Sequence, residues 1–384
     1  MNLVKPIRVL HIIKNFNLGG AETNLLNLIR ATDGHCFEVH VGYSKGGEIE
    51  DRFLHAGAKL FKYASEDHKI KSLATCSIVA RLVAYIRQHG LQIIHTHNFN
   101  AHVWGLMAAK LTGVKLIEHV HDFRYVESED YKRRHGNVAQ YRTIQYFKGW
   151  SDIVVVLTKQ NKDFLVRRRY YTTDRVREIR NGIPFELSGT YSAEETRRRF
   201  GLDEKALVVL TSARISAEKN IGLILDIAPE VTRQVPNVQF VIAGDGPLKN
   251  ELEQRARTEG LTNVRFIGFC ADMHEWLNAA DVFLLPSFLE LHSIAILEAL
   301  SRRLPVFISR DVGCNSEIFR DDHDGVLRDP FSPKEWEEAL VELLRDPVRR
   351  RRIGENGYAL CRNRFDIAKT AHAIESVYKQ LIGG

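Results

Sequence analysis

Short apolar segments rich in β-branched residues alternate with longer amphipathic segments along almost the whole chain. Strands that are apolar on both faces, with helices between them, are typical of a parallel sheet that helices cover on both sides. The alternation therefore predicts an α/β fold. In the first half, the expected strands are Ile7–Ile13, Phe37–Gly42, Leu91–His95, Lys115–His119 and Asp152–Leu157, and the expected helices include Ala21–Arg30, Ser77–His89 and Ala101–Leu111.

The alternation begins again after Pro, Gly and Ser residues interrupt it near Pro184–Thr196. Because 384 residues are too many for one compact core, two doubly wound, Rossmann-like domains are expected, residues 1–186 and 187–365. A final amphipathic helix within residues 366–384 needs a surface to dock on. The second set of strands is Ala206–Ala213, Gln239–Gly244, Val264–Phe269, Val282–Pro286 and Pro305–Ser309, with helices that include Ile221–Val235, Leu248–Glu259, Ile294–Arg302 and Pro333–Arg345.

The composition narrows the class of protein. Hydrophobic residues make up 44% of the chain and charged residues 27%, which argues against disorder. The formal net charge of +6 suits phosphorylated ligands or an anionic membrane surface and is diagnostic of neither. The five scattered cysteines predict reduced thiols in a cytoplasmic protein, and no Cys or His spacing indicates a structural metal. No apolar run approaches the roughly 18 residues of a membrane span.

Candidate ligand-binding groups follow the expected strands, because an open α/β sheet binds its ligand beyond the carboxyl ends of its strands. Gly19 and Gly20 open the helix after the first strand, where backbone N–H groups favour an anion. A tight turn is the alternative interpretation. The segment is not the G-x-G-x-x-G fingerprint of dinucleotide binding.

Arg214 and Lys219 follow the first strand of the second half. Two cations in such a loop are able to hold a diphosphate and stabilise it as it leaves. The alternative is an ordinary solvated surface pair.

Glu290 and Glu298 form the strongest candidate pair. Glu290 lies in the loop after Val282–Pro286, and Glu298 lies in the helix that begins near Ser293. The backbone N–H groups of Ser293 and Ile294 are able to donate hydrogen bonds to a phosphate. Glu298 stands in an otherwise apolar run, where a carboxylate needs a partner such as a pair of hydroxyls. An exposed position on an amphipathic helix is the alternative.

The segment Glu118-His119-Val120-His121-Asp122 ends a strand of the first half. Its histidines are able to donate a hydrogen bond to a sugar, to act as an acid or base, or to bind a metal. We expect His119 and His121 to point to opposite faces of a continued strand, which argues against a shared metal, and one of them to be structural. His95 and His97 are expected to serve packing or solvent contact.

Smaller signals fit the same picture. Gly244 lies in a turn after a strand, and Phe269 follows another strand, where backbone groups are able to read a nucleobase edge; either position also suits a plain turn. The basic runs Lys132–Arg134 and Arg167–Arg169 are typical of solvated faces, with contact to anionic lipid or a charged acceptor as the alternative.

Together these residues resemble the retaining glycosyltransferases of the GT-B fold, in the large E-x7-E family four ("glycosyl transferases group 1") that includes sucrose synthase-like and mannosyltransferase-like enzymes. The likeness covers essentially the whole chain. The matching segments are Gly19–Glu22, Arg180–Ile183, Arg214 with Lys219, Gly244–Pro247, and Glu290 with Glu298 inside P-S-x-x-E…LEAL, which is the specific one.

The resemblance implies two Rossmann-like domains that face a central cleft, with the acceptor side first, the nucleotide-sugar side second and the final helix crossing back. It implies transfer of a hexose-type sugar from a UDP- or GDP-sugar to a glycan or glycolipid hydroxyl in envelope or exopolysaccharide synthesis, without a metal or nucleic acid. Arg214 and Lys219 would stabilise the departing diphosphate. Glu290 would approach the donor sugar, Glu298 would bind the ribose, and His121 would orient the sugar.

The sequence departs from the family pattern in two places. Leu291, His292 and Ser293 follow Glu290 where the family usually has a small residue, often an aromatic residue and a glycine, and Pro184 replaces a common Asp. Neither change removes a core group, so an active enzyme is expected, although His292 bears on which sugar is accepted. Two alternatives remain open: a sugar-nucleotide epimerase of the same architecture and a catalytically silent nucleotide-sugar-binding subunit.

Overall fold

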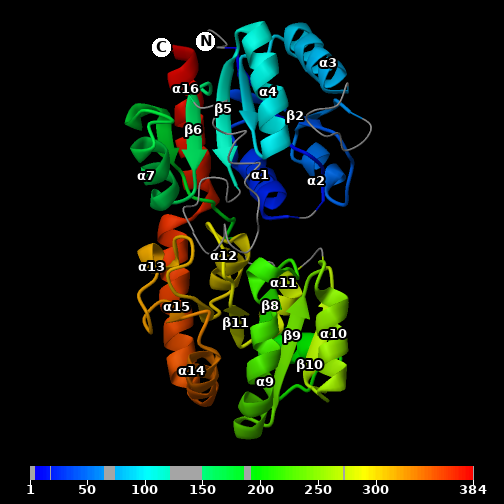
Figure 1. Cartoon of the computed structure of the whole chain (residues 1–384), viewed down its shortest axis with the longest axis vertical. Helices are drawn as coiled ribbons and strands as arrows, with labels where there is room; N and C mark the ends of the chain where they lie inside the picture. The colour runs from blue at the N-terminus through cyan, green and yellow to red at the C-terminus, as the bar shows by residue number, and fades with distance from the viewer. Residues whose placement is uncertain are drawn as a thin grey trace. The chain divides into compact units, whose positions relative to one another are not determined.

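The chain divides into two compact units, each built around its own parallel sheet. The computed structural model describes residues 5–17, 19–64, 74–121, 149–185, 192–270 and 273–383. The first unit comprises Met1–Gly182 with Ile367–Gly384, and the second comprises Ile183–Asp366 (Figure 1). Among the described residues, no helix combines the length and the apolar character that crossing a membrane requires.

The first unit contains a seven-stranded sheet in the order β3-β2-β1-β4-β5-β6-β7. Every neighbouring pair is parallel. The strands are β1 (Ile7–Ile12), β2 (Phe37–Tyr43), β3 (Lys59–Lys62), β4 (Ile93–Thr96), β5 (Lys115–Val120), β6 (Ile153–Val156) and β7 (Val176–Glu178). The helices are α1 (Gly20–Ala31), α2 (Glu50–His55), α3 (Ala74–His89), α4 (Phe99–Thr112), α7 (Lys159–Arg167), the short 3-10 helix η2 (Thr173–Arg175) and α16 (Ile367–Gly383).

Helices cover both faces of this sheet, as apolar strands require. One core cluster joins α1, α2 and α16 to the sheet, and another joins α3 and α4 to it. The C-terminal helix α16 packs along α1 in the first unit. Its buried positions Ala371, Ile374 and Tyr378 follow helical spacing, so burial of one stripe explains how this helix docks.

The second unit contains a six-stranded parallel sheet in the order β10-β9-β8-β11-β12-β13. Its strands are β8 (Leu207–Ser212), β9 (Val238–Ala243), β10 (Val264–Gly268), β11 (Val282–Leu285), β12 (Val306–Ser309) and β13 (Val326–Arg328). Its helices are α8 (Ala193–Arg199), the 3-10 helix η3 (Ala217–Lys219), α9 (Gly222–Gln234), α10 (Lys249–Thr258), α11 (His274–Ala279), α12 (Ile294–Ser301), α13 (Asn315–Ile318), α14 (Pro333–Arg345) and α15 (Pro347–Arg364).

The two faces of the second sheet have separate cores. On one face α9, α10 and α14 cover the sheet, and on the other α11, α12 and α15 do so (Figure 1). The α/β fold expected from the alternating pattern is confirmed, and both sheets are parallel. The centre of each sheet is a pair of strands whose carboxyl ends carry the candidate residues, namely β8 beside β11 and β4 beside β5.

Candidate functional site

Lys219 and Glu290 come together at the carboxyl ends of neighbouring strands in the second unit. Lys219 lies in η3 after β8, and Glu290 lies in the loop after β11. The Lys219 Nζ is 2.6 Å from the Glu290 Oε1, and the Ser287 hydroxyl donates to the same oxygen at 2.9 Å. The Lys219 and Glu290 side chains are only 18% and 9% exposed. The structure therefore places a largely buried cation and a buried carboxylate in direct contact.

Backbone contacts hold these two loops against each other. The N–H groups of Phe288 and Leu289 donate to the Glu218 carbonyl at 2.8 and 3.3 Å. On the other side, the N–H and thiol of Cys314 both donate to the Leu291 carbonyl, at 3.1 and 3.0 Å. The segment around Glu290 is thus fixed from two directions. The sequence alone did not single out Cys314, because its partner is a backbone carbonyl.

Arg214 differs from Lys219 in exposure. Its side chain is exposed, and within the described residues it makes no side-chain hydrogen bond or salt bridge with protein groups. The second unit therefore presents one solvent-facing cation, Arg214, and one largely buried cation, Lys219, within the same loop. Such a pair suits an anionic ligand of more than one charge.

Gly244 fixes the backbone of the loop that carries Arg214. Its φ is +138°, and a Cβ added there would lie 1.9 Å from the Ala213 carbonyl oxygen. The Gly244 N–H donates to the Gly268 carbonyl at 2.7 Å, and the Ile215 N–H donates to the Asp245 carbonyl at 2.9 Å. This close approach of two backbones leaves no room for a side chain and explains why glycine occupies position 244.

Glu298 projects from α12 and is partly buried. Burial raises the pKa of its carboxyl to about 7, and Arg302 lowers it by a smaller amount. In the described part of the chain its carboxylate has no hydrogen-bond or salt-bridge partner. The helix begins at Ile294 after the N-cap Ser293, and no side chain caps this end. The contact of the first-turn N–H groups with a phosphate stays a prediction.

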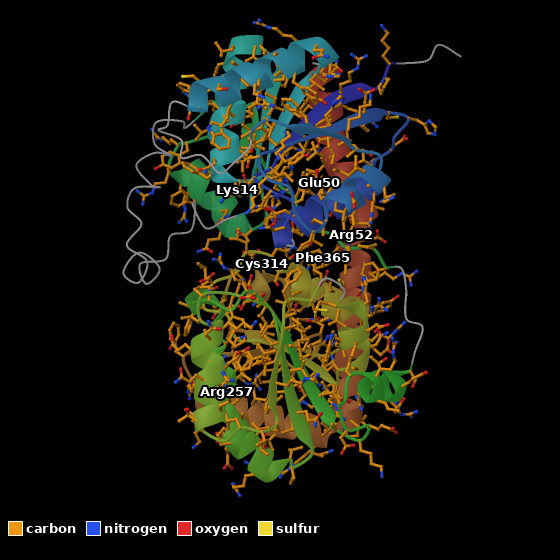
Figure 2. The ribbon with its side chains drawn as sticks, turned by 90° about the vertical axis from the view of Figure 1, so that its right-hand side faces the viewer. Lys14, Glu50, Arg52, Arg257, Cys314 and Phe365 are labelled. Atoms are coloured by element: carbon orange, nitrogen blue, oxygen red, sulfur yellow. The ribbon has the colours of Figure 1, made fainter. Side chains whose placement is uncertain are left out.

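Two aromatic side chains at this end of the second unit differ in their exposure to solvent. Phe269 follows β10 and is 41% exposed. His292 is buried, and its ring lies edge-on to Phe365 with ring centroids 4.7 Å apart. Cys314 and Phe365 lie at the same end of the second unit (Figure 2).

In the first unit, Gly19 is the N-cap of α1 and Gly20 is its first residue. No side chain caps this helix, and nothing lies within 4 Å of a Cβ built at Gly20. Leu18, in the same loop, lies outside the described residues. The Glu22 carboxylate of the first turn lies against this helix start, 2.6 Å from a Cβ built at Gly19, and accepts a hydrogen bond from its own backbone N–H. The predicted anion contact at Gly19 and Gly20 stays a prediction.

Five histidines meet at the carboxyl ends of β1, β4 and β5. The expectation that His119 and His121 point to opposite faces is wrong: their rings stack with centroids 4.0 Å apart. The physical reason is that residues two apart on a strand share one face. Asp122, the last residue of that motif, lies outside the described residues.

A hydrogen-bond chain runs through this cluster. His97 contacts His11 at 2.8 Å through its Nε2 and His121 at 3.1 Å through its Nδ1. Tyr378 of α16 extends the chain, since its hydroxyl lies 2.7 Å from the His95 Nδ1 and 3.3 Å from the His11 Nε2. Burial lowers the pKa values of His95, His97 and His119 far below the ordinary range and that of His11 to about 3. The buried imidazoles are therefore neutral at pH 7.

Only one of the two basic runs lies within the described residues. Arg167–Arg169 lies at the exposed end of α7, and Lys132–Arg134 lies outside the described residues. Contact with lipid or with a charged acceptor stays a prediction. The cysteines form no disulfide, and Cys314 and Cys361 are buried.

Comparisons with known proteins give the family. The family "Glycosyltransferase Family 4" matches residues 18–187, and "Glycosyl transferases group 1" matches residues 192–360. The alpha-D-kanosaminyltransferase of Streptomyces kanamyceticus is 28% identical over 72% of this chain and 73% of that protein. The UDP-Gal:alpha-D-GlcNAc-diphosphoundecaprenol alpha-1,3-galactosyltransferase of Escherichia coli is 24% identical over 98% of this chain and 97% of that protein.

A solved structure shows the same fold over nearly the full length. The crystal structure of Anabaena HepE in complex with UDP and glucose superposes with a TM-score of 0.83 at 20% identity, and the match covers 97% of this chain and 99% of that one. The two family matches together span both units described above. The chain is therefore a glycosyltransferase of the GT-B fold and belongs to family 4, the glycosyl transferases of group 1.

Proposed function

We propose that this glycosyltransferase moves a hexose-type sugar, with retention of configuration, from a UDP- or GDP-sugar to an acceptor hydroxyl. The observation that carries the proposal is the contact between Lys219 and Glu290 at 2.6 Å. It joins a cation suited to a diphosphate with a carboxylate suited to sugar hydroxyls. The complex of HepE with UDP and glucose supports a nucleotide-sugar donor.

The second unit supplies the proposed donor contacts. Arg214 and Lys219 hold the diphosphate, and their charge stabilises it as the bond from the sugar C1 to the phosphate oxygen breaks. The N–H groups of Ser293 and Ile294 add donors to the phosphate. Glu298 accepts hydrogen bonds from the two ribose hydroxyls.

The remaining proposed donor contacts are backbone and positioning ones. The backbone near Phe269 contacts the base, and Gly244 keeps the Arg214 loop close to the phosphate. Glu290 approaches the donor sugar and His121 orients it, while Gly19 and Gly20 of the first unit contact the donor through their backbone.

Retention follows from attack on the face that the leaving group departs from. The acceptor oxygen forms its bond to C1 on that face, and a departing phosphate oxygen takes the acceptor proton. The cationic side chains meet the diphosphate charge, so this proposed step needs no metal. Because no protein group forms a bond to the sugar, the chain's contribution is positioning and electrostatic stabilisation.

The proposed acceptor is a glycan or glycolipid, in the synthesis of a polysaccharide or another envelope component. The similarity to an Escherichia coli galactosyltransferase whose name includes a diphosphoundecaprenol acceptor supports this class. A peripheral contact of the basic loops with the membrane would bring the chain to a lipid-linked acceptor.

The test is an incubation of the full chain with UDP- and GDP-sugars, with and without candidate acceptors. Release of the nucleoside diphosphate together with a glycosylated product of unchanged anomeric configuration is expected. Isomerisation of the donor without release would instead identify an epimerase. Absence of turnover with every acceptor would leave a binding subunit and contradict the proposal.

A further inference from the structure

We propose that His97, His119 and His121 form a binding site for a divalent transition-metal ion of the zinc class. One ring nitrogen from each histidine lies within 4.8 Å of those of the other two. The inference concerns the first unit alone. It gives a second role to His121, which is proposed above to orient the donor sugar, and its test does not measure sugar transfer.

Sheet register brings these three side chains together. In the β4–β5 pair, His95 stands opposite Ile117, so continuing the register two residues places His97 beside His119. His121 follows His119 by two residues and shares its face. Pairs of histidines two residues apart on adjacent strands therefore converge on one face.

His119 provides an independent sign of a missing ligand. It is 1% exposed, and neither of its ring nitrogens has a hydrogen-bond partner among the described residues. Leaving such a buried polar group unpaired is destabilising. Buried unsatisfied groups of this kind point to a bound ion or an ordered water.

The spacing of the other two ligands fits one ion. The His97 Nδ1 lies 3.1 Å from the His121 Nε2. Two nitrogens bound to a tetrahedral zinc ion at about 2.0–2.1 Å lie roughly 3.4 Å apart. A small outward movement of His121, the least buried of the three, admits the ion between these atoms.

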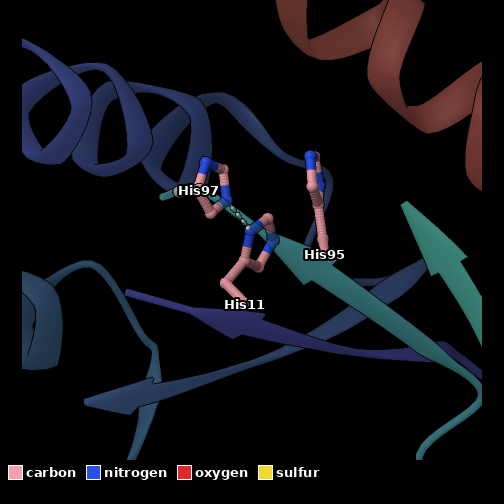
Figure 3. Close-up of side chains that lie close together, drawn as sticks. All are labelled: His11, His95 and His97. Atoms are coloured by element: carbon pink, nitrogen blue, oxygen red, sulfur yellow. Dashed lines mark hydrogen bonds between the residues drawn. The ribbon is translucent and has the colours of Figure 1, made fainter. Parts of the chain in front are cut away.

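The inner histidines supply the orienting hydrogen bonds that metal ligands normally have. When His97 binds through its Nδ1, its Nε2–H donates to the His11 Nδ1, 2.8 Å away (Figure 3). The His11 Nε2–H then donates to the Tyr378 hydroxyl, which donates to the His95 Nδ1. In this chain of bonds His97, His11 and Tyr378 each donate one proton, and His95 is the final acceptor.

The ligand set selects the class of metal. Three imidazoles without a carboxylate favour zinc, cobalt, nickel or copper over magnesium and calcium. Three protein ligands leave a fourth position open.

The test uses the full chain after chelator treatment, titrated first with Co²⁺ and then with Zn²⁺. We expect one cobalt ion per chain with the visible absorption bands of a four-coordinate site, and displacement of those bands by zinc. His119→Ala and His121→Ala should each weaken cobalt binding on the order of 100-fold. His55→Ala removes an exposed histidine of α2 and should leave the affinity unchanged.

Thermal unfolding separates ligation from a folding defect. Zinc should raise the melting temperature of the wild type and of His55→Ala, because an ion that binds only the folded state stabilises it. It should not raise that of His121→Ala, whose substitution lies beyond the end of β5 and should leave the metal-free fold unchanged. Absence of the cobalt bands, or equal affinity in His121→Ala and wild type, would overturn the proposal.

Discussion

The Nζ of Lys219 lies 2.6 Å from the Oε1 of Glu290, and both side chains are largely buried. Lys219 follows β8 and Glu290 follows the neighbouring strand β11, so the contact joins two loops at the centre of the second sheet. In the proposed reaction, a diphosphate that binds Lys219 would compete with this ion pair and bring its negative charge next to Glu290. The pair would therefore hold the cation in place before the donor binds.

Replacing Lys219 with alanine should remove most of the transfer activity. The loss of one preorganised charge at a developing anion costs on the order of 10²–10³ in kcat. Steady-state release of nucleoside diphosphate, measured with a donor and acceptor that the wild type turns over, checks this value.

Lys334→Ala is the matched control, because Lys334 is an 82% exposed lysine of α14. It should keep wild-type kcat. Circular dichroism should show both variants folded at the assay temperature. A nearly wild-type kcat in Lys219→Ala would contradict the proposal that Lys219 stabilises the departing diphosphate.

Glu298 should make the stability of the chain depend on pH. Burial raises its pKa from 4.5 to about 7, so between these values the folded chain holds a proton that the unfolded chain has lost. The free energy of unfolding should therefore fall as pH rises from 4.5 to 7, by at most about 3 kcal/mol, and level off above pH 7. Urea titrations across this range measure the slope.

Glu298→Gln should remove that slope, whereas Glu338→Gln, at a 62% exposed position of α14, should retain it. Binding of the donor ribose to the Glu298 carboxylate favours its charged form. Donor affinity should accordingly rise with pH up to about 7 in the wild type, and this rise should be absent in Glu298→Gln. Parallel stability profiles for wild type and Glu298→Gln would contradict the assignment of the titrating group.

Gly244→Ala should destabilise the second unit. The added Cβ would meet the Ala213 carbonyl oxygen at 1.9 Å, and the φ of +138° is unfavourable for alanine. A loss of at least about 1–3 kcal/mol in unfolding free energy is expected. Gly34→Ala is the control, because nothing lies within 4 Å of its added Cβ. Equal stability of the two variants would show that the close backbone approach is not rigid.

Gly20→Ala should separate binding from stability. The structure leaves room for its Cβ, and alanine is the better helix residue by about 1 kcal/mol. Stability should be kept or raised. If the backbone at Gly20 contacts the donor, as the family resemblance implies, the KM for the donor should rise. An unchanged KM would show that this loop begins the helix without contacting the donor.

The periodic parts of the fold were predictable from sequence because their signal is local. The expected strands and helices around β8, β11 and α12 agree with the structure to within one or two residues. Each candidate cation or carboxylate of the second unit follows a strand, so its place in the sheet edge could be inferred. The contact between Lys219 and Glu290 could not, because it depends on which strands are neighbours.

Helix α15 shows why other parts were missed. The Pro347–Arg364 segment is rich in arginine and has few apolar positions. Its buried face combines Ile353, Tyr358 and Cys361 with two glycines. A Cβ at Gly354 would lie 1.9 Å from the Arg303 carbonyl oxygen, and one at Gly357 would lie 2.5 Å from the Leu300 side chain. Because glycines take up part of the buried face, the apolar stripe that sequence periodicity detects is short.

The histidine cluster was missed for a different reason. The sequence pattern predicts packing or solvent contact for His95 and His97, and the opposite faces expected for His119 and His121 are wrong. Their meeting with His11 depends on the order β1-β4-β5, which joins segments far apart in the chain. The correct two-residue rule would have placed each pair on one face, although not the two pairs beside each other.

The central claim is that the second unit binds the diphosphate of a nucleotide-sugar donor through Lys219. Isothermal titration of UDP and GDP into the full chain tests this claim without knowledge of the acceptor. We predict that one of the two nucleotides binds with one site per chain, about 10–100-fold more weakly to Lys219→Ala and unchanged to Lys334→Ala, since a charge-assisted hydrogen bond contributes about 1.5–3 kcal/mol. Equal affinity of that nucleotide for wild type and Lys219→Ala, or binding of neither nucleotide, would contradict the account.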